Sequence, residues 1–160
     1  MPRRDFAGQN CAIADTLGLV GERWTLMIIR EVLLGRRRFR EIQRRTGVAP
    51  NILADRLQTL VEAEILRRVG DEPEYRPTRK AVDLQPVLLM LMEWGNKHVP
   101  REMGPSRVIY HTACEHDAHP YVVCAHCGEH LDPRETALRP GPGADEAQQA
   151  DGTIPQPRAA

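Results

Sequence analysis

Residues 38–78 narrow the choice of fold, because their apolar residues follow a helical spacing at first and a strand-like spacing afterwards. Two amphipathic helices are expected at 38–46 and 50–63, with Gly47 suited to end the first and Pro50 suited to start the second. The residues that the second helix would turn inward recur every three or four positions: Leu53, Leu57, Leu60 and Val61. Residues 65–78 then read as two short strands around a polar turn. A helix pair with a tight turn and a following hairpin predicts a winged helix-turn-helix.

Further helices flank this unit on both sides. Asn10 is suited to cap a helix at 10–21, and other helices are expected at 22–34 and 80–98. The centre of the last helix, residues 87–92, is apolar on every side. Because a surface helix keeps a polar face, we expect it to be covered both by its own domain and by a second subunit. The predicted fold class is α+β, mainly α: a winged helix-turn-helix with a long C-terminal dimerisation helix, plus a small zinc-ribbon-like extension.

The chain of 160 residues divides into segments of unlike charge and composition. Residues 1–100 hold 17 Lys and Arg against 13 Asp and Glu, whereas residues 101–160 hold 5 against 9, so zero net charge conceals a basic and an acidic part. We expect an N-terminal arm at 1–9, the winged-helix domain at 10–99, the extension at 100–138 and a disordered, Gly- and Pro-rich tail at 139–160. The sequence contains neither a signal peptide nor a membrane-spanning run, so a cytoplasmic location without membrane contact is expected.

Six arginines and one glutamate crowd residues 36–45, directly before the tight turn. A charge run is usually a solvated helix end, but its place beside the turn and the hairpin favours contact with DNA phosphates. Polar side chains on the outer face of the second helix can hydrogen-bond base edges, and arginines at the base of the hairpin can meet phosphate. The predicted DNA-binding residues are Arg36, Arg37, Arg38, Arg40, Asn51, Arg56, Gln58, Thr59, Arg67, Arg68 and Arg76. The acidic hairpin tip, which carries Asp71, Glu72 and Glu74, is expected to repel phosphate.

Several motifs carry a family resemblance: the run from Cys11 to Glu31 with its Gly-Glu-Arg-Trp-Thr segment, Arg38 to Ile42, Asn51 to Leu60, Tyr75 to Thr78, and Glu93-Trp94-Gly95. Through these motifs, residues 8–99 closely resemble the HxlR-type winged helix-turn-helix transcriptional regulators of the MarR-like superfamily. The resemblance implies a homodimer joined through its first and last helices. It also implies binding to double-stranded DNA at a pseudo-palindromic operator, with repression or activation as the outcome.

Cys11 stands near the start of the first predicted helix. Several HxlR-type regulators sense electrophiles or oxidants through a cysteine at this place, and a helix N-terminus makes a thiolate more available. The resemblance thus implies a redox or small-molecule effector that acts on Cys11. A small buried apolar side chain is the alternative. No second cysteine lies nearby in the sequence, so a reactive Cys11 would form an adduct or a disulfide between subunits.

Two Cys/His pairs in the extension have the spacing of metal ligands: His111 with Cys114, and Cys124 with Cys127. A structural Zn²⁺ takes four nitrogen or sulfur ligands, and a pair in a tight turn supplies half of the set. We predict a zinc-ribbon-like domain in which these four residues hold a structural zinc. Relatives of the HxlR type with a similar extension support this choice. Other candidates for the histidine position are His116, His119, His126 and His130, and free thiols in a disordered segment are the alternative to a metal site.

Catalysis is not expected from this chain. The Cys/His cluster lacks the His-x-Glu and Pro-Cys elements of a zinc deaminase, and three thiolates with one imidazole leave zinc no open position for water. Cys124 and Cys127 also lack the βαβ surroundings of a redox dithiol. The predicted function is a sequence-specific DNA-binding transcriptional regulator. The alternative is a winged-helix and zinc-ribbon module that binds protein partners in a larger assembly.

Overall fold

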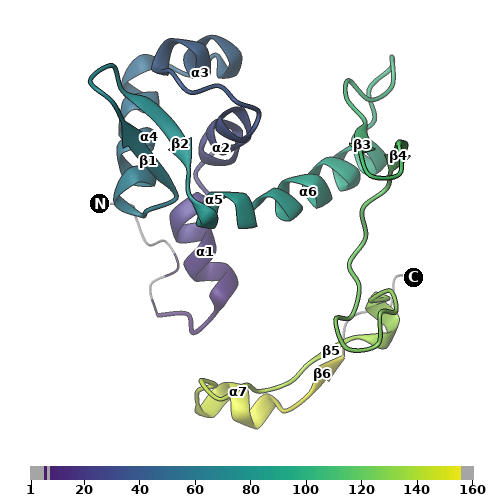
Figure 1. Ribbon diagram of the computed structural model, residues 1–160. Coiled ribbons are helices and arrows are strands. Elements are labelled where there is room, and N and C mark those ends of the chain that lie inside the picture. Colours follow the sequence, from purple (N-terminus) through teal and green to yellow (C-terminus); the bar gives the residue numbers. More distant parts are fainter. Residues whose placement is uncertain (1–5, 7, 156–160) are drawn as a thin grey trace. The chain divides into compact units, whose positions relative to one another are not determined.

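The computed structural model describes residue 6 and residues 8–155 (Figure 1). The chain forms two compact units, Met1–Arg107 and Val108–Ala160, so the boundary falls later than the expected position near residue 99. Most of the N-terminal arm expected at 1–9 lies outside the described residues, as does the end of the expected tail.

The first unit is mainly helical. Its elements are α1 (Ala12–Val20), α2 (Thr25–Leu33), α3 (Phe39–Thr46), α4 (Pro50–Glu62), β1 (Leu66–Val69), β2 (Glu74–Pro77), α5 (Arg79–Asp83) and α6 (Gln85–His98). The strands β1 and β2 pair antiparallel, with Leu66 opposite Pro77 and Val69 opposite Glu74. Because the hairpin follows directly on the α3–α4 pair, the prediction of a mixed, mainly helical fold of winged helix-turn-helix type is confirmed.

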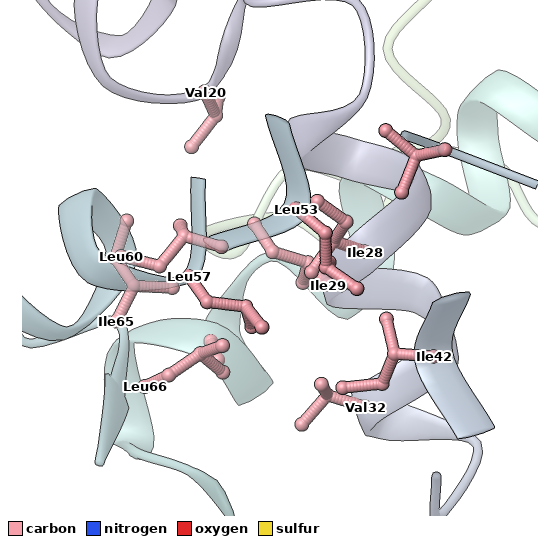
Figure 2. Close-up of a cluster of buried hydrophobic side chains, with 12 residues drawn as sticks. Val20, Ile28, Ile29, Val32, Ile42, Leu53, Leu57, Leu60, Ile65 and Leu66 are labelled. Atoms are coloured by element: carbon pink, nitrogen blue, oxygen red, sulfur yellow. The ribbon is translucent and has the colours of Figure 1, made fainter. Parts of the chain in front are cut away.

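The core of this unit gathers apolar side chains from five helices and the start of the hairpin (Figure 2). Ile28 and Ile29 of α2 meet Leu53 and Leu57 of α4, and all four are 0% exposed. Burial of each such side chain contributes about 1.5–3 kcal/mol. The remaining members are Val20, Val32, Ile42, Val48, Leu60, Ile65, Leu66 and Ala81. The helical spacing in the sequence thus identified the inward face of α4 correctly.

Helix boundaries differ from the expectation in three places. The helix expected from residue 22 begins at Thr25. The N-cap of α1 is Cys11, not Asn10. The long helix expected at 80–98 is two helices, α5 and α6, with Leu84 between them. Pro86 accounts for the break, because proline lacks the N–H that would continue the hydrogen-bond ladder and its ring clashes with the carbonyl four residues earlier.

The helix α6 is not buried on all sides by its own unit. Leu88 packs against the core, whereas Val87, Leu91 and Trp94 are 48%, 50% and 59% exposed. These three residues are spaced by four and three positions, so they form one stripe along the helix. Its own unit therefore covers only one side of α6.

The second unit contains short elements: β3 (Ile109–His111), β4 (His116–Ala118), the 3₁₀ helix η1 (Pro133–Glu135), β5 (Ala137–Leu138), α7 (Glu146–Asp151) and β6 (Ile154–Pro155). The last two differ from the expectation of a disordered tail. The helix α7 begins with a reciprocal cap, in which the Gln148 N–H donates to Asp145 Oδ1 at 2.9 Å and the Asp145 N–H donates to Gln148 Oε1 at 3.1 Å. Reasoning from composition alone overlooked this cap.

Among the described residues, no helix combines the length and apolar character needed to cross a membrane.

Candidate nucleic-acid interface

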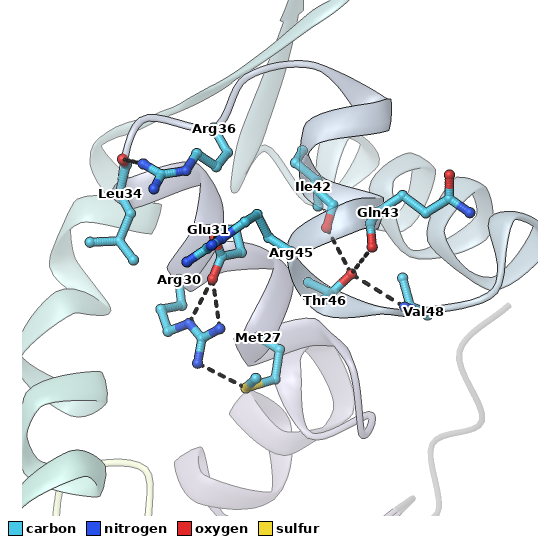
Figure 3. A network of polar contacts seen from close by, with 10 residues as sticks. All are labelled: Met27, Arg30, Glu31, Leu34, Arg36, Ile42, Gln43, Arg45, Thr46 and Val48. Atoms are coloured by element: carbon cyan, nitrogen blue, oxygen red, sulfur yellow. Dashed lines mark hydrogen bonds and ion pairs between the residues drawn. The ribbon is translucent and has the colours of Figure 1, made fainter. Parts of the chain in front are cut away.

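The turn between α3 and α4 holds the two helices in the predicted arrangement. Gly47 has a φ of 72°, a left-handed conformation that favours glycine, and its N–H donates to the Gln43 carbonyl at 2.8 Å. The Thr46 hydroxyl donates to the Ile42 carbonyl at 2.8 Å (Figure 3). Pro50 then opens α4 at a position where no backbone N–H is needed. With its apolar residues in the core, α4 presents its other face to solvent.

The polar residues predicted for base readout lie on that face, and three of the four are already engaged within the helix: Arg56, Gln58 and Thr59. Asn51 and Gln58 are exposed, and Gln58 Nε2 donates to Glu62 Oε1 at 2.8 Å. Arg56 is ion-paired with Asp55, and the Arg56 side chain is only 17% exposed. The Thr59 hydroxyl donates to the Asp55 carbonyl at 3.0 Å. Arg56 and Gln58 must therefore exchange these partners to reach a base.

The arginines before α3 and in its first turn have different roles. Arg36 Nη1 donates to the Leu34 carbonyl at 2.6 Å and Arg37 Nη1 donates to the Val32 carbonyl at 3.0 Å, so both satisfy carbonyls at the end of α2. The side chain of Arg40, on α3, is exposed. Of these three arginines, Arg40 is therefore the one most available for phosphate.

Arg38 is exposed to solvent, and its guanidinium also pairs with the hairpin. Its guanidinium lies 3.4 Å from Glu72 and 3.8 Å from Glu74, both carboxylates of the acidic hairpin tip. The backbones of the two segments are also joined. The Tyr75 N–H donates to the Arg37 carbonyl at 2.7 Å, and Arg38 and Glu74 form an isolated antiparallel β-bridge. The acidic tip thus serves to attach the hairpin to α3, a role that the charge pattern alone did not indicate.

Glu41 orders the start of α3. Its Oε2 accepts the backbone N–H groups of Arg37 and Arg38, each at 3.1 Å. These backbone donors, the Arg38 one first, lower the pKa of the Glu41 carboxyl below its ordinary value. The ionised form of Glu41 is therefore part of the folded helix start.

At the base of the hairpin, Arg67 and Arg76 are cross-strand partners, so both guanidinium groups leave the same face. Like charges directly opposite are unfavourable without an anion between them. Arg76 pairs with Glu74 at 3.0 Å, which relieves part of this repulsion. Arg68 lies opposite Tyr75 on the other face. A phosphate could therefore bind to the Arg67 and Arg76 face.

Glu31 is a buried carboxylate that the sequence analysis did not select. Its side chain is 2% exposed; Oε1 lies 2.6 Å from Arg30 Nη2, and Oε2 lies 3.7 Å from Arg45 Nε (Figure 3). Within the described residues, Oε2 accepts no hydrogen bond. The sequence did contain a signal for this burial: Glu31 lies on the same side of α2 as the apolar residues Ile28 and Val32.

Cys11 lies at the helix start, as predicted. It is the N-cap residue of α1, is partly buried and forms no disulfide.

The two Cys/His pairs fold into turns of the same shape. The Glu115 N–H donates to the His111 carbonyl at 2.9 Å, and the Gly128 N–H donates to the Cys124 carbonyl at 2.8 Å. Glu115 and Gly128 both have a left-handed φ, 58° and 79°. Within the first pair, His111 Nδ1 lies 3.1 Å from Cys114 Sγ.

In the second pair, the backbone N–H groups of Cys127 and His126 and the side chain of Cys127 lower the pKa of the Cys124 thiol. The ligand atoms that both pairs offer, thiol sulfur and imidazole nitrogen, are those that zinc prefers. However, nowhere in the described part of the chain do three or more His, Cys, Asp or Glu side chains gather as a metal site. The structure therefore brings together the members of each pair, but not the predicted set of four.

Comparisons with known proteins agree with the helix-turn-helix geometry. Residues 19–103 match the family described as HxlR-like helix-turn-helix. The chain is 40% identical over 143 residues to Rv3095 of Mycobacterium tuberculosis, an uncharacterized HTH-type transcriptional regulator, with 86% of this chain and 89% of the relative covered.

Solved structures extend this similarity to the fold. PA1374 of Pseudomonas aeruginosa, a proposed transcription factor, is 34% identical with a TM-score of 0.61, and the match covers 88% of this chain and 99% of PA1374. Quinone-bound YodB of Bacillus subtilis is 30% identical with a TM-score of 0.50, and the match covers 54% of this chain and 98% of YodB. On this evidence, the chain belongs to the HxlR-like helix-turn-helix family of transcriptional regulators.

Proposed function

We propose that the protein regulates transcription by binding a pseudo-palindromic DNA operator as a homodimer, with α4 of each subunit in one major groove. The observation that carries this proposal is the outer face of α4, where Asn51 and Gln58 are exposed while Leu57 anchors the helix in the core. Arg40 on α3 and Arg67 on the hairpin add exposed cations for phosphate. Affinity then comes mainly from two such faces acting together, because the net charge of the domain is small.

A second copy of this chain is the proposed partner of the apolar faces of α1 and α6. Ile13 and Leu17 on α1 are 70% and 41% exposed, and the stripe of Val87, Leu91 and Trp94 on α6 is similarly uncovered. Contiguous apolar surface of this kind favours association, and a two-fold dimer lets the same surface serve both subunits.

The test is genome-wide mapping of bound sites, followed by fluorescence anisotropy on the best site and on a scrambled duplex of equal length. We expect the mapped sites to share two half-sites about one helical turn apart. Equal affinity for both duplexes would contradict the proposal. Stable capture by one protein partner, without preference among DNA sequences, would favour the alternative of a protein-interaction module.

We further propose that Cys11 responds to electrophiles. The support is its place at the N-terminus of α1 and the quinone-bound state of the related YodB. Treatment with a benzoquinone should add one adduct at Cys11, seen by mass spectrometry, and change operator affinity. Cys11→Ser should abolish both effects; an unchanged response in this variant would contradict the sensor role.

For the second unit we propose a structural Zn²⁺ held by His111, Cys114, Cys124 and Cys127. The support is the matching shape of the two turns, together with the lack of any fully buried residue among the described part of this unit. A segment with so little core needs a cross-link to be stable. Elemental analysis should find one zinc per chain, retained by Cys11→Ser and lost in both Cys114→Ser and Cys124→Ser. Metal content that survives these two changes would refute the ligand set.

A further inference from the structure

A cavity of about 600 Å³ lies in the first unit, lined by residues of α2, α3, α6 and the segment that follows α6. Its volume is in the range of sites that bind small organic molecules. None of the predicted DNA-binding residues lines it, and Cys11 does not line it either. The cavity is therefore a separate feature from the helix-turn-helix face.

The wall on α2 contains Glu31, whose side chain is 2% exposed and whose Oε2 accepts no hydrogen bond within the described residues. Arg45 Nε lies 3.7 Å from this oxygen, too far for a hydrogen bond (Figure 3). A buried carboxylate oxygen without a donor is costly. Because this oxygen has almost no accessible surface beside Arg45, a ligand hydroxyl group reaches it only when Arg45 moves aside.

The other walls are cationic and apolar. Arg101 and Arg107 line the cavity beside Arg30 and Arg45, and among the described residues neither Arg101 nor Arg107 takes part in an ion pair. Four arginines against one glutamate leave the cavity strongly positive. Leu34, Met92 and Val99 provide apolar contact surface between the charged groups.

We propose that this cavity binds a small hydroxylated organic acid. Its hydroxyl group donates to Glu31 Oε2, its carboxylate pairs with Arg101 and Arg107, and its hydrocarbon part lies against Leu34 and Met92. The ligand's role as an effector rests on the proposed function. Arg45 belongs to α3, so a ligand hydroxyl group that displaces Arg45 from Glu31 alters how the helix-turn-helix packs on α2 and lowers operator affinity.

Calorimetry on the full chain without DNA tests the site independently of regulation. The probes are para-hydroxyphenylpropionate, phenylpropionate, which lacks the hydroxyl group, and para-ethylphenol, which lacks the carboxylate. The first should bind saturably, and each of the others about tenfold more weakly, because each loses one charge-assisted hydrogen bond or ion pair.

Variants assign the contacts. Arg101→Ala and Arg107→Ala, both at exposed positions, should weaken the acid about tenfold and leave para-ethylphenol unchanged. Glu31→Gln should remove most of the preference for the hydroxylated acid, with circular dichroism confirming that it folds. Arg79→Ala, an exposed arginine outside the cavity, is the matched control and should bind like the wild type.

Absence of saturable binding by all three probes, or binding indifferent to the Arg101 and Arg107 changes, would overturn the site. Binding with unchanged operator affinity would overturn its effector role. Failure of the unliganded protein to prefer any operator would count against the proposed function and leave the calorimetric result standing.

Discussion

Replacement of Arg56 by alanine separates base recognition from general attraction to DNA. In the free chain the Arg56 guanidinium is held by Asp55, and its stem is packed so that only 17% of the side chain is exposed. If this guanidinium reads a base in each half-site, its loss should reduce operator affinity and leave binding to random DNA almost unchanged.

The expected size follows from the two copies and the existing ion pair. A lost base contact costs about 1–3 kcal/mol in each subunit. The ion pair between Arg56 and Asp55 contributes about 0–1 kcal/mol, because the Asp55 side chain is exposed. This pair must break when Arg56 contacts a base, so its loss offsets part of the binding free energy that the base contact provides. With the middle of each range, about 2 kcal/mol less about 0.5 kcal/mol in each subunit, operator affinity should fall by about 3 kcal/mol per dimer, or roughly 100-fold.

The assay is fluorescence anisotropy on operator and scrambled duplexes at several salt concentrations, with Arg40→Ala as the comparison. Arg56→Ala should keep the wild-type salt dependence, whereas Arg40→Ala should weaken both duplexes and reduce the salt slope by about one per subunit. Equal losses on operator and scrambled DNA from Arg56→Ala would refute base readout by this residue. Thermal melting of each variant verifies that the fold is retained.

Three other changes test the fold and the assembly. Leu57→Ala, at a 0% exposed core position, should lower the free energy of unfolding by about 2–5 kcal/mol in urea titrations, whereas Ile52→Ala on the exposed face should cost far less. Because its backbone donors lower the pKa of Glu41, this group stabilises the fold above the ordinary carboxyl pKa, and the contribution is lost as pH falls through the lowered value; melts of Glu41→Gln between neutral and acid pH should show a shallower loss. Leu91→Glu should yield a monomer by light scattering with reduced operator affinity, and a dimer that persists would contradict the role of α6.

The helix-turn-helix was predictable because its signals are local. Apolar spacing identified the inward residues of α4, and Gly47 and Pro50 marked its turn. The break between α5 and α6 carried a local signal as well, in Pro86, which the continuous apolar run obscured. The Asp145 cap of α7 was another local signal hidden by a composition typical of disorder.

The roles of charged residues were harder to infer, because each depends on a partner distant in sequence. Arg37 and Arg38 look alike in the arginine run, yet one binds a carbonyl of α2 and the other pairs with the hairpin tip. The role of Glu31 could not be inferred without the position of Arg45, which depends on how α3 packs on α2.

By itself, the sequence determined the order of helices and strands in the helix-turn-helix region and the family, and it indicated candidate residues for DNA and metal binding, because spacing and residue type are local properties. Only the tertiary structure decided which arginines are engaged by the protein itself and which face of α6 stays uncovered. It also decided that a buried carboxylate and four arginines share one cavity. The physical reason is that hydrogen bonds, ion pairs and burial are short-ranged, so their pattern depends on which segments pack together.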